Sequence, residues 1–500
     1  MISKKHFPFT QLRVSILGIR RCVGGILTGF SGFLKRFNVC GFCLFLALSS
    51  SSLFAETTIS RIPAGGLTID QPGNYVFTND IKWYPSGDGQ AILVTANDVT
   101  IDMRHFKLIN RRSGYSTIGI VAQGVENFTL AHGTIKNMNL GGIKCDSCLN
   151  VEIAHMVVDG LSLDNTATYT VPVGILVSSS LNATVHKCKV ENIDVKTGST
   201  AAIQMSSTLG SVISDCHVKN LMNRDGACTG IGHLLCDIAE VRGCHIEMLQ
   251  SQFIDNLNTE GHTAIGIFPF TTTNLLISDC HIKNIVGCCD DAHWMSIFEC
   301  ASAIVEKCKV ENVVDGLGAA QSGAKATGIE VYASFVLVND CKVKNITAVN
   351  PQDKQATGFS CAQCLGVAFN RCHAKNVRVV DSAGRQNPEL GYGTGFGWAP
   401  DPRPIFIEPA IGILYQDCEA EKCQVGFDTW FHIDSLWIRI ISRHNQIPIL
   451  NKLCSQRSLS CNPCSECGCT ATGCYPVPIA VTTIDNVASN NTFVDVTVID

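Results

Sequence analysis

The sequence predicts an all-β protein: a right-handed parallel β-helix, which is a single solenoid with three strands per coil and about ten to twelve coils. One observation is a nine-residue segment that recurs in fixed register, as in ISDCHVKNL at 213–221, ISDCHIKNI at 277–285 and VEKCKVENV at 305–313. A second is that its apolar residues are largely β-branched and alternate with polar ones, which favours strands over helices. A unit of this size cannot bury its apolar face alone, so stacked units are expected.

The composition limits the class of protein and its compartment. The chain has 500 residues, 43 glycines and a charged fraction of 16%. Its net charge of −5 gives no reason to expect binding to nucleic acid or to an anionic membrane. Its 27 cysteines are a heavy load for a reducing cytosol. The composition therefore favours an exported protein over a cytosolic one.

The N-terminal segment also points to export. Basic residues precede an apolar run of secretory-signal length at 39–48, and the small residue Ala55 follows as a cleavage position. A run of about ten apolar residues is too short to span a bilayer comfortably. We therefore interpret residues 1–55 as a signal peptide, so that the mature protein is secreted or lies on the cell surface without a membrane span. A retained membrane anchor is the alternative, because residues 23–34 add apolar length.

Two columns of residues run through the repeat and predict a structural ladder. Aliphatic residues lie three positions before and two positions after an aligned cysteine, so the cysteine shares their inward face. A buried thiol behaves there as a small, inert apolar group. An asparagine four positions after the cysteine is expected at a turn, where stacked amides can hydrogen-bond from coil to coil. The ladder comprises Cys188, Cys216, Cys244, Cys280, Cys308, Cys341 and Cys372 with Asn192, Asn220, Asn284, Asn312, Asn345 and Asn376.

Each repeat holds three short strands. A third apolar column lies thirteen residues before the cysteine, usually after a Gly or Ala, as at Ile203, Ile231 and Ile267. Three parallel strands per turn with aliphatic residues inside make a β-helix, whereas a propeller needs longer repeats. The expected organisation is a signal peptide at 1–55, an N-terminal cap with the first strands at 56–98, the β-helix at 99–440, and a Cys-rich C-terminal cap with terminal strands at 441–500.

These features resemble the right-handed parallel β-helix repeat proteins of the pectin-lyase-like superfamily. The matching features are the Gly-Ile strand starts, the aliphatic triplets and the Asn after each third strand, over about residues 91–440. The segment IDQPGNYVFTND at 69–80 also resembles the first strands of bacterial members. The superfamily contains lyases, hydrolases, epimerases, tailspikes and adhesins, so the resemblance implies the fold and leaves the activity open. It further implies a cleft along the first strand of each coil.

Candidate catalytic residues lie near that cleft. Among the outward residues of the first strands, Glu330 is the one ionisable group. The loop GCCDDAHWM at 287–295 brings Asp290, Asp291 and His293 to the same edge. In a hydrolase or lyase, Asp291 would be the general acid or base and Glu330 the second carboxylate. Asp290 would then hold water or a cation, and His293 would polarise a carboxylate. The paired aspartates resemble those of polygalacturonases, but the other motifs of polygalacturonases and pectate lyases are missing.

The outer row that follows the cysteine column carries histidines and charged residues. His217, His245 and His281 each follow an aligned cysteine, and Lys or Glu lies two positions further on. We interpret this row as a solvated face of mixed charge, because no carboxylate or cysteine joins the histidines in tetrahedral spacing. The sequence therefore predicts no metal site, and it predicts no cofactor.

The C-terminal segment 454–474 changes character because six cysteines gather in it. In a cytosolic protein such spacing indicates a zinc site. In an exported protein an even number of cysteines is better explained by disulfides that pin a loop-rich cap. Six cysteines allow 15 pairings, between which the sequence does not choose. The disulfide candidates are Cys454, Cys461, Cys464, Cys467, Cys469 and Cys474.

Three functions are compatible with these features. The first is an exported, non-enzymatic β-helix that binds a polysaccharide or a protein component of a cell envelope or host surface. This is the expected function, because a first-strand row with one ionisable residue lacks the paired groups of a glycosidase. The second is a polysaccharide hydrolase or lyase with an acidic cleft. The third is a structural envelope protein cross-linked through its cysteines. Nucleic acid is not an expected partner.

Overall fold

The computed structural model divides the chain into Met1–Ala55 and Glu56–Asp500, and only the second unit is described below. The predicted signal peptide therefore lies outside the described residues. Among the residues that are described, no helix combines the length and the apolar character needed to cross a membrane. The structure describes residues 55–500 except 164–170, 197, 225, 252–262, 288–290, 317–324, 350–354, 362–363, 382, 387–392, 398–409, 429–431, 451–482, 487–490 and 500.

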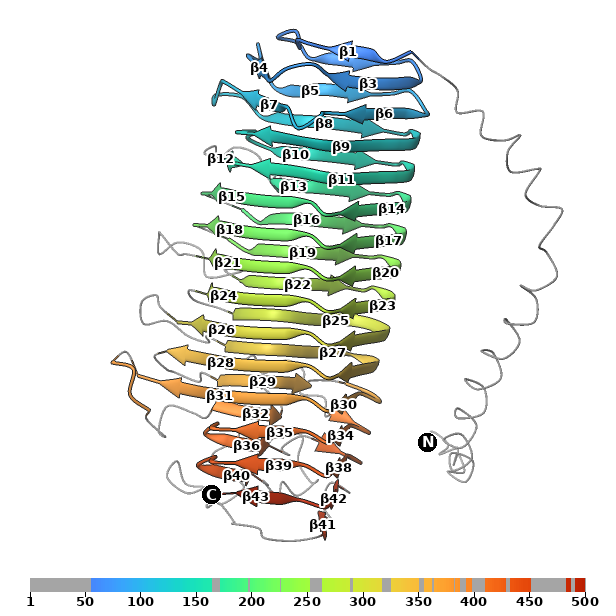
Figure 1. Ribbon diagram of the computed structural model, residues 1–500. Helices are drawn as coiled ribbons and strands as arrows, with labels where there is room; N and C mark the ends of the chain where they lie inside the picture. Colours follow the sequence, from blue (N-terminus) through green and yellow to red (C-terminus); the bar gives the residue numbers. More distant parts are fainter. Residues whose placement is uncertain are drawn as a thin grey trace, which may run out of the picture. The chain divides into compact units, whose positions relative to one another are not determined.

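The second unit is a parallel β-helix, which confirms the predicted fold class. Successive coils pair in parallel, each strand with the strand one coil further along the chain, and Figure 1 shows them stacked one above another. The strands form three faces, here called faces A, B and C in chain order. Among the described residues, face C contains fourteen strand segments, of which eleven fall within residues 91–440, in agreement with the predicted number of coils.

Face A carries the first strand of each coil. Long strands β25 and β27 run through the corner and contribute their first halves to face A and their second halves to face B. Face A consists of β2 (Leu67–Ile69), β5 (Gly89–Val94), β8 (Thr117–Gln123), β10 (Gly141–Asp146), β13 (Val173–Ser178), β16 (Thr200–Ser206), β19 (Cys228–Leu234), β22 (Ala264–Phe270), β25 (Asp291–Glu306), β27 (Lys325–Asn339), β29 (Gln355–Cys361), β32 (Gly393–Gly397), β36 (Val425–Asp428) and β40 (Ile447–Leu450).

Face B follows, and it shares β9 and β11 with face C. It consists of β1 (Thr57–Ile59), β3 (Gly73–Phe77), β6 (Val99–Asp102), β9 (Glu126–Lys136), β11 (Leu149–Asp159), β14 (Leu181–His186), β17 (Leu209–Ser214), β20 (Asp237–Arg242), β23 (Thr273–Ser278), the ends of β25 and β27, β30 (Ala368–Asn370), β34 (Leu414–Gln416), β38 (Leu436–Ile438) and β42 (Asn491–Val494).

Face C completes each coil. It consists of β4 (Ile81–Trp83), β7 (Lys107–Asn110), the ends of β9 and β11, β15 (Lys189–Val195), β18 (His217–Asn223), β21 (His245–Ser251), β24 (His281–Gly287), β26 (Lys309–Asp315), β28 (Lys342–Val349), β31 (His373–Val380), β35 (Glu419–Glu421), β39 (Ile441–Arg443) and β43 (Thr497–Ile499). Four short strands remain: β12 (Ser162–Leu163), β33 (Ala410–Ile411), β37 (His432–Ile433) and β41 (Thr483–Asn486).

The coils extend beyond the expected limits of the helix. Strands β1 to β5, within the expected cap at 56–98, already pair in parallel with later coils. At the other end, β42 and β43 stack on β38 and β39. The six cysteines at 454–474 lie outside the described residues, so their predicted disulfides stay a prediction.

One continuous apolar core fills the interior, from Ile59 in the first coil to Phe493 in the last. Along each strand the aliphatic columns point inward, as the period-two pattern requires. The last coils hold aromatic residues in place of aliphatic ones. There Tyr415 stacks on Trp437 at 3.8 Å between ring centroids, and Trp437 stacks on Phe493 at 5.6 Å. Parallel stacking in register explains how large rings fit a narrow interior.

The aligned cysteines are buried free thiols at the corner between faces B and C. Their position has a chemical reason, because the corner leaves carbonyl groups facing inward. The Sγ of Cys216 lies 3.3 Å from the carbonyl oxygen of Ser214 and 3.6 Å from that of Val185 in the preceding coil. A thiol is small and apolar enough for the core, yet its S–H is a weak donor to those carbonyls.

A second column of small donor groups lies at the corner between faces A and B. Each of its members lies eight residues before the corresponding position of the aligned-cysteine column. Here Ser180 donates to the carbonyl oxygen of Ser178 at 2.7 Å, and Cys236 contacts that of Leu234 at 3.3 Å. Serine, threonine and cysteine therefore serve the same purpose at equivalent corners. The column consists of Cys148, Ser180, Thr208, Cys236, Thr272, Cys300 and, after the alanine Ala333, Cys364.

The asparagine column bends the chain within face C. All six predicted asparagines have a φ between 55° and 62°, the left-handed region that Asn tolerates better than most residues. Their amides bond from coil to coil: Asn220 donates to Asn192 at 2.9 Å, and Asn376 donates to Asn345 at 2.7 Å. Met248 occupies the same position with a φ of 61° and interrupts the ladder.

We expect the column thiols to resist alkylation in the native protein. Cys216, Cys244, Cys280 and Cys308 are each 1% exposed. Their burial in the apolar core keeps the alkylating reagent away from the sulfur atoms. Iodoacetamide labelling read by peptide mass spectrometry should modify these four residues only after denaturation. Rapid native labelling, or a mapped disulfide between two of them, would contradict this.

Candidate functional site

The structure places Asp291, His293 and Glu330 on the face A parts of β25 and β27. Glu330 lies on β27 and is only 6% exposed. Its carboxylate pairs with the ammonium of Lys325 and accepts a hydrogen bond from Ser296 on β25 at 3.3 Å. The carboxylate is therefore committed to two partners in a site with little access to solvent.

Two further predicted catalytic residues are placed through the backbone. Asp291 lies on β25 beside Lys325 of β27, and His293 lies beside Thr327 in the same register. Asp290 and the side chains of Asp291 and His293 lie outside the described part of the chain. The structure thus brings the strand of Asp291 and His293 against the strand of Glu330, while the catalytic assignment stays a prediction.

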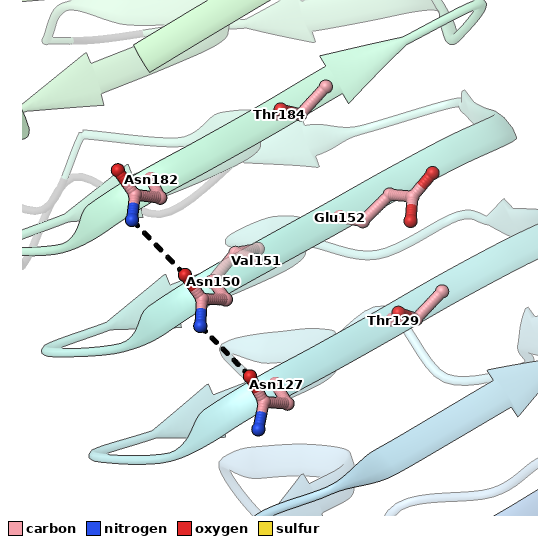
Figure 2. Close-up of a pocket in the computed structure, with 7 residues that line it drawn as sticks. All are labelled: Asn127, Thr129, Asn150, Val151, Glu152, Asn182 and Thr184. Atoms are coloured by element: carbon pink, nitrogen blue, oxygen red, sulfur yellow. Dashed lines mark hydrogen bonds between the residues drawn. The ribbon is translucent and has the colours of Figure 1, made fainter. Parts of the chain in front are cut away.

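A hollow on face B offers polar groups that are open to solvent. It has a volume of about 330 Å³ and lies across β9, β11 and β14 (Figure 2). One row of outward side chains crosses these strands in register: Thr129, Glu152 and Thr184. A second row lies beside it and consists of Asn127, Asn150 and Asn182, with Val151 completing the lining.

The second row is an amide ladder that the local backbone conformation holds in place. The three asparagines have φ values of 57°, 56° and 53°, in the left-handed region. Asn150 donates to Asn127 at 2.9 Å, and Asn182 donates to Asn150 at 3.2 Å (Figure 2). Each amide has two N–H donors and two oxygen lone pairs, and a ladder bond uses one N–H of one amide and one lone pair of the next. Hydrogen-bonding capacity is therefore left for a ligand in the hollow.

Glu152 gives the hollow its charge. Its side chain is 53% exposed, and its carboxylate lies 3.1 Å from Nε2 of His186 on β14. Among the seven residues that line the hollow, Glu152 is the one ionisable group. Glycoside hydrolysis usually requires two carboxylates across the scissile bond. The hollow is consequently equipped to form hydrogen bonds to a ligand but lacks the paired acids of a glycosidase.

Sequence reasoning missed this hollow, although the sequence contains a signal for it. Asn182 lies six residues before Cys188, and Asn274 lies six residues before Cys280. Asn127 and Asn150 keep this offset from Gly133 and Met156, which take the place of the cysteine in earlier coils. A search for asparagines at a constant offset would have found a second ladder. It would not have shown that the surface is hollowed there.

Comparisons with known proteins give structural likenesses only. No protein-family profile matches the chain. No curated protein matches it either. Among solved structures, the catalytic domain of a GH87 α-1,3-glucanase in complex with nigerose is similar with 9% identity and a TM-score of 0.28, over 73% of this chain and 59% of that one. The tailspike of E. coli bacteriophage HK620 in complex with a pentasaccharide is similar with 12% identity and a TM-score of 0.37, over 76% of this chain and 68% of that one. The chain thus spans about three fifths of the glucanase domain.

Proposed function

We propose that the protein binds a glycan without cleaving it, through the hollow on face B. The observation that carries this proposal is the row Thr129, Glu152 and Thr184, which presents a hydroxyl, a carboxylate and a hydroxyl on three successive coils beside an amide ladder (Figure 2). Sugar hydroxyls both donate and accept hydrogen bonds, and these three kinds of side chain supply matching partners.

The spacing of the coils suits a chain of sugars. Neighbouring strands lie about 4.8 Å apart, which is close to the length of one pyranose residue. A glycan that runs along the axis of the solenoid could therefore present one sugar to each coil. The amides of Asn127, Asn150 and Asn182 are already held by their mutual hydrogen bonds, so binding costs little additional side-chain entropy.

The openness of the hollow favours a polymer over a small metabolite. Small-molecule sites are usually deep and mostly apolar, whereas this surface is lined mainly by amides, hydroxyls and a carboxylate. Export by the N-terminal segment, an outer-surface location and membership of the pectin-lyase-like superfamily are parts of the same proposal. They are supported by the sequence patterns at 1–55 and 91–440.

Replacing Glu152 by Gln tests the site. A glycan array first identifies a ligand, and isothermal titration then measures its affinity. Because a hydrogen bond to a charged group contributes about 1.5–3 kcal/mol, Glu152→Gln should weaken binding roughly tenfold or more. Glu240→Gln is the matched control. Glu240 occupies the same outward row on β20, beyond Thr184 and Val212 and outside the hollow, so its replacement should leave the affinity unchanged.

Two outcomes would count against the proposal. Equal affinity of the wild type and Glu152→Gln would remove the hollow as the binding site. Release of reducing sugar from the bound glycan by the wild type would remove the non-enzymatic part and favour the predicted hydrolase, with Asp291 and Glu330 as the residues to replace next.

A further inference from the structure

Three histidines lie side by side on the outside of face C, in coils that follow those of the hollow. His217 on β18, His245 on β21 and His281 on β24 are in register. Their ring centroids are 5.0 Å and 4.9 Å apart, and neighbouring rings are nearly perpendicular, at 85° and 89°. Lys189 and Lys309 continue the row on either side. The histidines therefore form a short imidazole cluster bounded by positive charge.

A carboxylate joins this cluster, which corrects the expectation that none would. Glu247 lies two residues after His245 on the same outward face of β21, and its Oε2 is 3.6 Å from Nε2 of His245. One ligand atom each from His217, His245 and Glu247 lies within 4.8 Å of the other two. The expectation was wrong because it considered spacing along the chain, whereas the donors come from adjacent coils.

One ring nitrogen of the cluster lacks a partner. Nε2 of His217 is buried without a hydrogen-bond partner among the described residues. A buried polar atom without a partner is costly unless a ligand or water satisfies it.

We propose that His217, His245 and Glu247 bind one divalent transition-metal ion of the Zn²⁺ class on the outer surface of β18 and β21. Two imidazole nitrogens and one carboxylate oxygen form a donor set that suits Zn²⁺ and its neighbours in the first transition row. Metal–ligand bonds of about 2.0–2.2 Å require the three donor atoms to lie closer together than the 4.8 Å within which they are found. The ion would draw them together by rotating their partly exposed side chains.

The groups around the three donors leave room for one ion and keep its fourth coordination position open. Lys283 contacts Glu247 at 3.4 Å and would release it to the ion, because such a surface pair contributes little. His281 already contacts Glu311 at 3.2 Å, so it is not needed as a ligand. Three protein donors leave a fourth position for water or for a carboxylate or imidazole of another molecule. The ion would also link two neighbouring coils at their surface.

The site is tested by metal titration of the full chain after treatment with a chelator. Zn²⁺ is titrated in competition with a chromophoric chelator, and Co²⁺ binding is followed by visible absorption. We expect His245→Gln to lose one bound ion, or to bind it at least about 100-fold more weakly, because loss of even a supporting second-shell group typically costs 10–100-fold. Glu247→Gln should also weaken binding.

His373→Gln is the matched control. His373 occupies the equivalent position on β31, but its register neighbours are Lys342 and Glu419, with no second imidazole. Its replacement should leave the metal affinity unchanged. Metal bound by cysteines is recognised separately, because Co²⁺ bound to thiolate shows intense near-ultraviolet charge-transfer bands that nitrogen and oxygen donors do not produce.

Two results would overturn the proposal. One is an unchanged number of ions and unchanged affinity in His245→Gln. The other is a Co²⁺ spectrum of the wild type with thiolate bands alone. Circular dichroism and the urea midpoint of each metal-free variant show whether the fold is intact, which we expect because these side chains point outward. The test does not depend on glycan binding, so failure of the proposed function would leave it unaffected.

Discussion

Lowering the pH from 7 to 4.5 should destabilise the protein by about 2–3 kcal/mol through His233 alone. Burial lowers the pKa of His233 from 6.5 to about 4. As the pH falls below 6.5, the unfolded chain takes up a proton at this position while the folded protein does not until about pH 4. The unfolded state therefore binds more protons in this window, and stability falls as the pH falls.

The position of His233 explains the size of the effect. It lies on β19 in an inward column of face A, between Met205 and Pro269 in register, and is 1% exposed. Neither ring nitrogen has a hydrogen-bond partner among the described residues. An unpaired imidazole in an apolar interior already costs free energy when neutral, and its charged form costs far more.

Replacing His233 by Met tests this account, because Met205 occupies the same column one coil earlier. His233→Met should raise the urea midpoint at pH 7 and should remove most of the difference between the midpoints at pH 7 and pH 4.5. His132→Gln, which removes an exposed histidine, is the control and should keep the wild-type difference. An unchanged pH difference in His233→Met would show that other groups cause the acid sensitivity.

Replacing Cys244 by Asp should destabilise the protein by about 3–5 kcal/mol, the usual cost of an uncompensated buried charge. The Sγ of Cys244 lies 3.4 Å from the carbonyl oxygen of Arg242 and 3.8 Å from that of Ile213. A carboxylate there would face two acceptors without a donor, in a position that is 1% exposed. Desolvation and repulsion therefore act in the same direction.

The matched control for this change is Cys244→Ser. Serine keeps a donor for the same carbonyls, and Ser180 and Thr272 already fill equivalent corners in the second column. Its cost should stay within about 1.5 kcal/mol, the scale of a single net hydrogen bond. Urea denaturation followed by circular dichroism measures both variants. Equal midpoints for Cys244→Asp and Cys244→Ser would contradict the role assigned to the column.

The repeat predicts the fold well because every coil must have the same kinds of residue at its inward positions and at its corners. Three strands per coil, inward thiols and turning asparagines all follow from constant offsets around Cys216 or Cys280. The same pattern places His233 inward beside the outward Gly232, but periodicity does not reveal that the core lacks a partner for it. The free-energy cost of the unpaired imidazole depends on the residues around it, and these are known only once the coils are stacked.

The surface was harder to predict, because its sites combine residues from different coils. Glu247 and His217 are 30 residues apart in the chain and meet only through the register of β18 and β21. Likewise, Thr129, Glu152 and Thr184 come from coils of unequal length, so their spacing in the sequence is irregular. They align in one row only through the pairing of β9, β11 and β14. Glu330 was expected beside a cleft, but it is only 6% exposed and pairs with Lys325, a contact that depends on side-chain reach and not on the repeat.

The most direct test of the proposed function is a crystal structure of the protein soaked with the oligosaccharide that binds best on a glycan array. We expect electron density for an intact glycan along face B, with successive sugars opposite Thr129, Glu152 and Thr184 and hydrogen bonds to the amides of Asn127 and Asn150. Density on face A beside Glu330, with face B empty, would contradict the proposed function.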